Sequence, residues 1–89
     1  MKKFYNFVNL RAVILRKLFR RRVIGGKHTA FEHVVSGIPS HLAGESKTVA
    51  DELIKEGLIL TKPTSYGLQI SLNPERMDEI IKIIESEEK

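Results

Sequence analysis

The spacing of apolar residues predicts a first helix over residues 6–24. At about 100° per residue, apolar side chains gather on one broad face of this helix and cations on the opposite face. The apolar face is Phe7, Val8, Ile14, Leu15, Leu18 and Phe19, with Leu10 and Val13 extending it past half of the circumference. Gly25-Gly26 is expected to end the helix, because glycine readily adopts the left-handed conformation of a C′ residue.

Two further helices are expected between residues 29 and 56. Thr29 followed by Glu32 fits a capping box for a short helix over 29–36, although residues 27–29 could instead form a very short strand. After a turn at 37–39, the next helix begins either directly after Ser40 or after a separate turn at 41–43, and Gly57 ends it. The residues expected to face inward are Phe31, Val34, Val35, Leu42, Ser46, Val49, Ala50 and Leu53.

Residues 58–62 and 68–72 are predicted to form two strands joined by a five-residue hairpin loop over 63–67. The second strand alternates with a period of two, as expected for a strand with one buried face. Its inward positions are Leu68, Ile70 and Leu72, and its outward positions are Gln69 and Ser71. Asn73 then caps a last helix with Pro74 at its first position. The apolar stripe of that helix is Met77, Ile80, Ile81, Ile83 and Ile84.

Length and composition indicate one small domain in a reducing environment. The 89 residues are 42% hydrophobic and 29% charged, as in ordinary globular domains. The chain has no cysteine, which excludes a disulfide scaffold and a thiolate metal site and favours a cytoplasmic location. No run approaches the ~20 apolar residues that cross a bilayer, so no membrane partner is expected.

The net charge of +4 hides a strong asymmetry along the chain. Residues 1–27 contain nine Lys or Arg and no acid, whereas 28–72 and 73–89 are both net acidic. Such an asymmetry indicates a surface for an anionic partner on the basic side, with a solvated helix face as the alternative. The cations singled out on the first helix and its exit are Arg16, Lys17, Arg20, Arg21, Arg22 and Lys27.

The order helix, short helix, turn, helix and hairpin resembles a winged helix-turn-helix domain. In 49–59 a leucine packs inward, a glycine ends the helix and an apolar strand follows, as at the end of that family's recognition helix. Segments 25–29, 62–67 and 71–74 are similar to small archaeal winged-helix proteins. The resemblance implies a mainly helical α+β fold with a basic helix in 1–27, a helix-turn-helix in 28–57, a two-stranded wing hairpin in 58–72 and an added C-terminal helix in 73–89.

The resemblance also implies where nucleic acid would bind. The third helix of this family usually enters the major groove, and the wing touches an adjacent groove or the phosphates. The matching positions are His41, Lys47, Thr48 and Lys55 in the helix and Lys62, Thr64, Ser65 and Tyr66 in the wing. The expected recognition helix departs from the pattern, since it carries Glu45, Asp51 and Glu52 and lacks arginine, the commonest reader of guanine. The cations of the first helix therefore contact either the backbone beside the groove or an anion on another face.

No catalytic residue, metal site or cofactor is predicted. A phosphate-binding loop around Gly26-Lys27 would need a glycine where Arg21 stands and a hydroxyl residue where His28 stands. His28 and His33 are five residues apart and would diverge by about 140° on a helix, whereas zinc-binding histidines four apart share a face. The chain is therefore expected not to be an enzyme.

These features predict a small DNA-binding protein, acting as a transcriptional regulator on duplex DNA. Structured RNA, or a protein bound by the same scaffold, is the alternative partner. The wide apolar face of the first helix predicts a homodimer in which first and last helices pack across a two-fold axis. The alternative is that the last helix folds back and covers this face within one chain.

Overall fold

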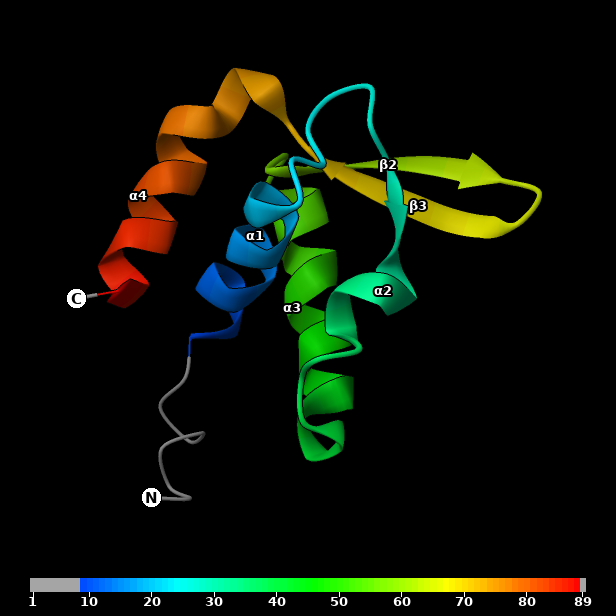
Figure 1. Cartoon of the computed structure of the whole chain (residues 1–89), viewed down its shortest axis with the longest axis horizontal. Coiled ribbons are helices and arrows are strands. Elements are labelled where there is room, and N and C mark those ends of the chain that lie inside the picture. Colours follow the sequence, from blue (N-terminus) through cyan, green and yellow to red (C-terminus); the bar gives the residue numbers. More distant parts are fainter. Residues whose placement is uncertain (1–8, 89) are drawn as a thin grey trace.

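Helices and a small antiparallel sheet make up residues 9–88, the part of the chain described by the computed structural model (Figure 1). The α-helices are α1 (Leu10–Arg20), α2 (Phe31–Val35), α3 (Ala43–Lys55) and α4 (Met77–Glu88), and the 3-10 helices are η2 (Ser40–Leu42) and η3 (Pro74–Arg76). The strands are β1 (Thr29–Ala30), β2 (Ile59–Thr64) and β3 (Gly67–Leu72). This architecture confirms the predicted α+β, mainly helical, winged-helix-like fold.

The sheet has the strand order β1-β3-β2, so β3 lies between its two neighbours. Thr29 pairs with Ile70 and Ala30 with Gln69, which realises the short-strand alternative for the segment before α2. The capping box predicted at Thr29 is therefore wrong, because Thr29 is a strand residue. Ala30 is the N-cap of α2 and makes no side-chain capping bond.

Helix α1 runs from Leu10 to Arg20 and so ends four residues before the predicted end. Asn9 is its N-cap, with an extended backbone and a side chain that accepts a hydrogen bond from the Ala12 amide at 3.3 Å. The C-terminal end was wrongly placed at Gly25-Gly26, because the helix ends at Arg20 and Arg22 occupies the left-handed C′ position with φ of +57°. The expected helix start at residue 6 and the apolar positions 7 and 8 lie outside the described residues.

The end of α1 is closed by a Schellman motif. The Arg22 amide donates to the Phe19 carbonyl, and the Val23 amide donates to the Leu18 carbonyl, both at 3.0 Å. These two bonds satisfy carbonyls that the last helical turn would otherwise leave unpaired. Val23 is buried, so the motif turns the chain back into the core directly after the helix.

Helix α3 ends with the same pair of hydrogen bonds. The Gly57 amide donates to the Ile54 carbonyl at 3.0 Å, and the Leu58 amide donates to the Leu53 carbonyl at 3.1 Å. Gly57 has φ of +82°, which confirms the predicted glycine C′ residue. The start of α3 follows the second of the two predicted alternatives, a separate turn, seen here as η2.

The wing hairpin is tighter than predicted. Thr64 pairs with Gly67, so a two-residue turn at 65–66 replaces the expected five-residue loop. The Thr64 hydroxyl donates to the Gly67 carbonyl at 2.8 Å and accepts from the Tyr66 amide at 3.1 Å. This side chain therefore holds the turn together, and the strands extend to it on both sides.

The expected alternation along the second wing strand holds only where the strand crosses the core. Ile70 and Leu72 are buried as predicted, but Leu68 is 47% exposed, because the hairpin projects beyond all the helices (Figure 1). Ser71, expected to face outward, is fully buried, and its hydroxyl has no hydrogen-bond partner among the described residues. The sheet is therefore covered on both faces at its inner end and uncovered at the wing.

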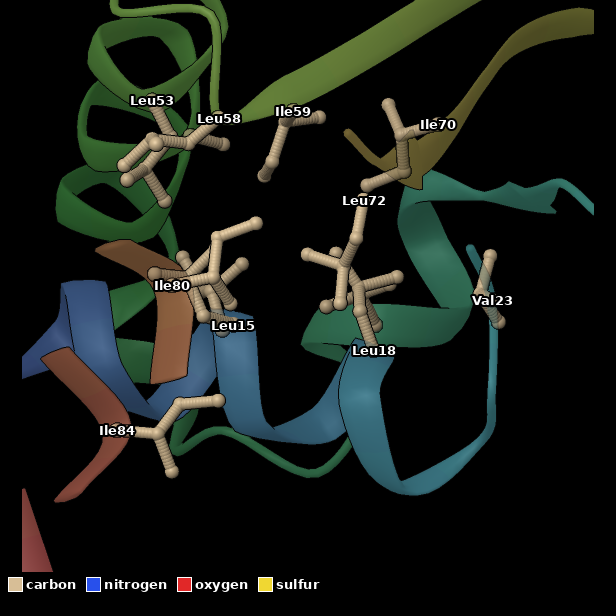
Figure 2. Close-up of a cluster of buried hydrophobic side chains, with 13 residues drawn as sticks. Leu15, Leu18, Val23, Leu53, Leu58, Ile59, Ile70, Leu72, Ile80 and Ile84 are labelled. Atoms are coloured by element: carbon tan, nitrogen blue, oxygen red, sulfur yellow. The ribbon is translucent and has the colours of Figure 1, made fainter. Parts of the chain in front are cut away.

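Apolar side chains, most of them leucine and isoleucine, from the four α-helices and from β2 and β3 form one core (Figure 2). Its fully or nearly fully buried members include Leu15, Leu18, Leu53, Leu58, Ile59, Ile70, Leu72, Ile80 and Ile84. Burying one such side chain contributes about 1.5–3 kcal/mol. Since Ile80 and Ile84 pack here, α4 covers part of α1 within the same chain, the alternative to an intermolecular contact.

The segment that joins β3 to α4 closes the end of α3. The Asn73 side chain caps η3 by accepting from the Glu75 amide at 3.0 Å, and it donates to the Gly57 carbonyl at 2.8 Å. Arg76 donates to the Glu56 carbonyl at 3.2 Å. Arg76 also hydrogen-bonds to Glu79 and thereby lowers the pKa of that carboxyl group. The C-terminal end of α3 is thus held by cationic and amide donors.

Candidate nucleic-acid interface

The C-terminal half of α1 carries its cations on the surface opposite to the core. Leu15 and Leu18 are fully buried, so the helical period turns the intervening and following positions outward. Lys17 is half-buried, and Arg20 and Arg21 are exposed. The Schellman motif at the end of α1 then turns the chain, so Arg21 lies at a corner rather than on a continuing helix.

These cations line one surface hollow between α1 and the segment that begins in α2. The hollow has a volume of about 360 Å³ and is here called the cationic hollow. Its lining residues are Lys17, Arg20, Arg21, His33, Ser36 and Gly37. None of these described residues is acidic, so nothing in the lining offsets the three positive charges.

One hydrogen bond across the cationic hollow joins α2 to the residue that follows α1. The Arg21 guanidinium donates to the His33 carbonyl at 3.4 Å, and the Ser36 hydroxyl donates to the same carbonyl at 3.1 Å. The His33 ring Nδ1 lies 3.4 Å from the Thr29 hydroxyl. The short helix α2 is therefore tied both to the strand before it and to the cationic end of α1.

Lys17 lies directly over Gly37. A Cβ atom built on Gly37 would lie 2.9 Å from the Lys17 Nζ atom, so any side chain at this position would displace the ammonium group. Within residues 9–88, neither Lys17 nor Arg20 forms an ion pair or a side-chain hydrogen bond. Their charges are thus available to an external ligand.

The other predicted cations of the first helix and its exit do not join the cationic hollow. Arg22 and Lys27 are exposed but do not line it. Arg16 instead lines a second hollow of about 320 Å³ between α1 and α4, together with Phe19, Ile81 and Glu85. Arg20 lines both hollows, so it lies on the ridge that separates them.

The outward face of α3 carries the predicted residues, but its charges are mixed. The structure exposes His41, Lys47, Thr48 and Lys55, as predicted. The Lys47 ammonium lies 4.0 Å from the Asp51 carboxylate, and the Thr48 hydroxyl donates to the Gly44 carbonyl at 3.3 Å. Exposed Glu45 and Glu52 add further negative charge. The net electrostatic attraction of this face for an anion is therefore weak.

The wing presents polar and aromatic groups at its tip. Lys62, Ser65 and Tyr66 are exposed, and the Tyr66 side chain is 93% exposed. The Thr64 hydroxyl makes two bonds inside the turn, so its first role is structural. The wing is formed by β2 and β3, whereas the residues of the cationic hollow belong to α1, α2 and the segments that directly follow these two helices.

Three residues of the cationic hollow were not singled out from the sequence: His33, Ser36 and Gly37. His33 and Ser36 lie three positions apart at the end of the predicted short helix, on the side away from its apolar residues. That spacing places His33 and Ser36 on one face of the predicted helix, but it does not predict that this face contacts Lys17. The contact depends on how α1 packs, and that is a tertiary feature.

Other chemistry is not indicated in the described part of the chain. Residues 9–88 contain no group of three or more His, Asp or Glu side chains that could hold a metal ion. No helix in that range is long and apolar enough to span a bilayer.

Comparisons of the chain with family models, curated proteins and solved structures found no match. The function therefore has to be inferred from the residues themselves.

Proposed function

We propose that this protein binds duplex DNA and acts as a small transcriptional regulator, with most of the binding energy coming from the phosphate backbone. The observation that carries the proposal is the cationic hollow, where three cations gather without an acidic residue in the lining. Lys and Arg side chains at phosphates supply the sequence-independent part of DNA affinity. The winged-helix-like order of elements supports the choice of duplex DNA as the ligand.

The proposal departs from the usual use of this fold. In place of strong base recognition by α3, whose outward face is electrically mixed, the cationic hollow would hold the backbone. Contacts from Lys55 or the wing residues Lys62 and Tyr66 would set the orientation on the duplex. Discrimination between sequences is expected to be modest, because phosphate contacts position a protein without reading bases.

Binding of a labelled random-sequence duplex, measured by fluorescence anisotropy at increasing salt, tests the proposal. Binding through the phosphate backbone predicts that log K falls linearly with log[salt], with a slope of about −0.9 for each phosphate that the cations neutralise. Absence of binding to any duplex at low salt contradicts the proposal. Parallel titrations with single strands and structured RNA distinguish the RNA alternative, for which the same cations would serve.

A protein partner is the second candidate, and the exposed apolar side chains favour it. The large hydrophobic residues that the structure exposes are Leu60, Tyr66 and Leu68, and all three belong to the wing. Exposed aromatic and aliphatic groups on one element are typical of protein contacts. A wing that served only a protein partner would leave duplex affinity unchanged in the variant Tyr66→Ser, whereas a wing contact to DNA would lower it.

We further propose that two copies associate through α1 and α4. The hollow between these helices has Phe19, Ile81 and Ile84 as apolar residues, with arginines on the α1 side and Glu85 on the α4 side. A two-fold axis would bring the apolar residues of the two copies together. Light scattering after gel filtration measures the mass, and a monomer at all concentrations contradicts this arrangement.

The absence of cysteine suits a reducing, cytoplasmic setting.

A further inference from the structure

We propose that the cationic hollow is a binding site for a single phosphate group, held jointly by Lys17, Arg20 and Arg21. The inference rests on the proposed function, because the phosphate would belong to the backbone of the bound duplex. It adds that one specific phosphate is enclosed by the protein, rather than attracted by a diffuse positive surface. The consequence is a fixed point from which the rest of the molecule is oriented on the duplex.

The three cations supply complementary donors. An ammonium group is a compact charge with three N–H donors, whereas a guanidinium presents a planar set of donors that matches two phosphate oxygens at once. The side chains of Lys17 and Arg20 make no hydrogen bond among the described residues, and Arg21 uses Nη1 on the His33 carbonyl. The remaining donors of Arg21 stay free to bind while that bond holds the side chain in position.

The unfavourable features of the hollow are offset within it. The hollow lies at the C-terminal ends of α1 and α2, where helix carbonyls repel an anion. At the α1 end, the Phe19 and Leu18 carbonyls accept from the Arg22 and Val23 amides. The His33 carbonyl, however, already accepts from both Arg21 and Ser36. Glu32, the acid of α2, lines a different hollow with Phe31 and Asp51. The field at the cationic hollow therefore remains positive.

Gly37 gives the site a feature that a diffuse basic surface would not have. Because a Cβ at this position would meet the Lys17 Nζ atom at 2.9 Å, Gly37→Ala moves the ammonium group without altering any charge. The backbone of Gly37 is not left-handed, so alanine fits its conformation. The atom that must move is the end of a flexible side chain, so the fold is expected to survive.

Titration with inorganic phosphate at constant ionic strength, followed by NMR of the full chain, tests the site directly. Saturable shifts confined to Lys17, Ser36, Gly37 and their neighbours are expected. Gly37→Ala and Lys17→Gln should each weaken phosphate binding severalfold. The matched control is Gly26→Ala, because a Cβ there meets nothing within 4 Å, and this variant should bind phosphate like the wild type. A uniform shift without saturation overturns the inference.

The same variants measured with duplex DNA separate the two proposals. Loss of both phosphate and duplex affinity in Gly37→Ala, but not in Gly26→Ala, supports both. Saturable phosphate binding without any duplex binding at low salt supports the site and overturns the proposed function, leaving a free phosphate compound as the ligand. Duplex binding that is insensitive to Gly37→Ala and Lys17→Gln overturns the site and leaves the proposed function standing.

Discussion

The C-terminal ends of α1 and α3 have the same hydrogen bonds but differ in what surrounds them. Both close with a Schellman motif, one with Arg22 at the left-handed position and the other with Gly57. The α3 end is held further by Asn73 and Arg76, and Arg11 forms an ion pair with Glu56 at 2.8 Å. The α1 end instead carries Lys17, Arg20 and Arg21, none of which forms an ion pair with another described residue.

The two ends differ in the steric cost of their left-handed residue, which supports the proposed role of the α1 end. Glycine accepts the left-handed conformation without steric cost, whereas arginine there costs about 1–2 kcal/mol. An unfavourable backbone conformation that persists is a reason to look for function nearby. Arg22 directly follows Arg20 and Arg21 of the cationic hollow, so the α1 end retains charge at the expense of stability. The α3 end is built for stability.

The largest expected effect is a loss of duplex affinity when two cations are removed from the C-terminal end of α1. Removing two cations from α3 is the comparison. The double variant Lys17→Gln/Arg21→Gln should lower duplex affinity about tenfold at 0.1 M salt, as expected for the loss of the contact to one phosphate. Lys47→Gln/Lys55→Gln removes the same net charge from α3 and should cost much less, since Lys47 is near Asp51. Anisotropy titrations of both variants measure this, and equal losses would remove the functional distinction between the two regions.

Placing a side chain at the α3 end should be destabilising. Gly57→Ala forces alanine into φ of +82° and brings its Cβ to 3.1 Å from the Arg76 Nη1 atom. We expect a loss of about 1–2 kcal/mol in the free energy of unfolding, from the left-handed conformation. Urea denaturation followed by circular dichroism measures it. An unchanged midpoint would mean that the α3 end does not need its glycine.

The reverse exchange at the α1 end should be stabilising. Arg22→Gly relieves the left-handed strain and adds chain entropy to the unfolded state, for a net gain of about 0.5–1 kcal/mol. Arg22→Ala keeps the strain and removes the same charge, so it is the control. Both variants should bind duplex DNA more weakly, by less than about tenfold for one contact. A stability gain in Arg22→Ala as well would contradict the assignment of strain.

The smallest expected effect is a dependence on pH at the segment that closes α3. Arg76 lowers the pKa of the Glu79 carboxyl by its hydrogen bond, so the ion pair stabilises the folded chain above the unfolded pKa of Glu, about 4.3. That contribution is lost as pH falls through the lowered pKa of the folded state. Thermal melts between neutral and acidic pH, compared with Glu79→Gln, measure it. The variant should lose part of the acid dependence, and an identical pH profile would show that the pair is inert.

Much of the fold was predictable because local rules and tertiary packing agree over most of the chain. The apolar period placed Leu15, Leu18 and Leu53 in the core, and Gly57 marked the end of α3. Asn73 and Pro74 likewise marked the start of the last helical segment. At each of these positions the residue that local propensity favours is also the residue that the packed structure uses.

The predictions failed where tertiary contacts override local preference. Gly25-Gly26 looked like the end of α1 because glycine usually supplies the left-handed residue, yet Arg22 adopts that conformation two residues after Arg20. Leu68 follows the alternation of its strand but extends past the core that would bury it. Thr29 fits a capping box, but pairing with Ile70 in β3 makes it a strand residue.

The candidate site was predictable in part. Charge alone singled out Lys17, Arg20 and Arg21, because they belong to a segment without acids. Their separation from Arg16 depends on where α4 packs, and their meeting with Gly37 depends on a contact between positions twenty residues apart in the chain. Neither arrangement follows from a helical wheel, which describes one helix at a time.

The position of β2 at the edge of the sheet has a consequence for self-association. An edge strand offers unpaired backbone groups to strands of other molecules, which is a route to aggregation. The outer part of β2 carries Lys62 and Pro63, and proline lacks the amide hydrogen that an added strand would need. The wing can therefore project from the molecule with Leu60, Tyr66 and Leu68 exposed, while its edge resists growth of the sheet from one chain to the next.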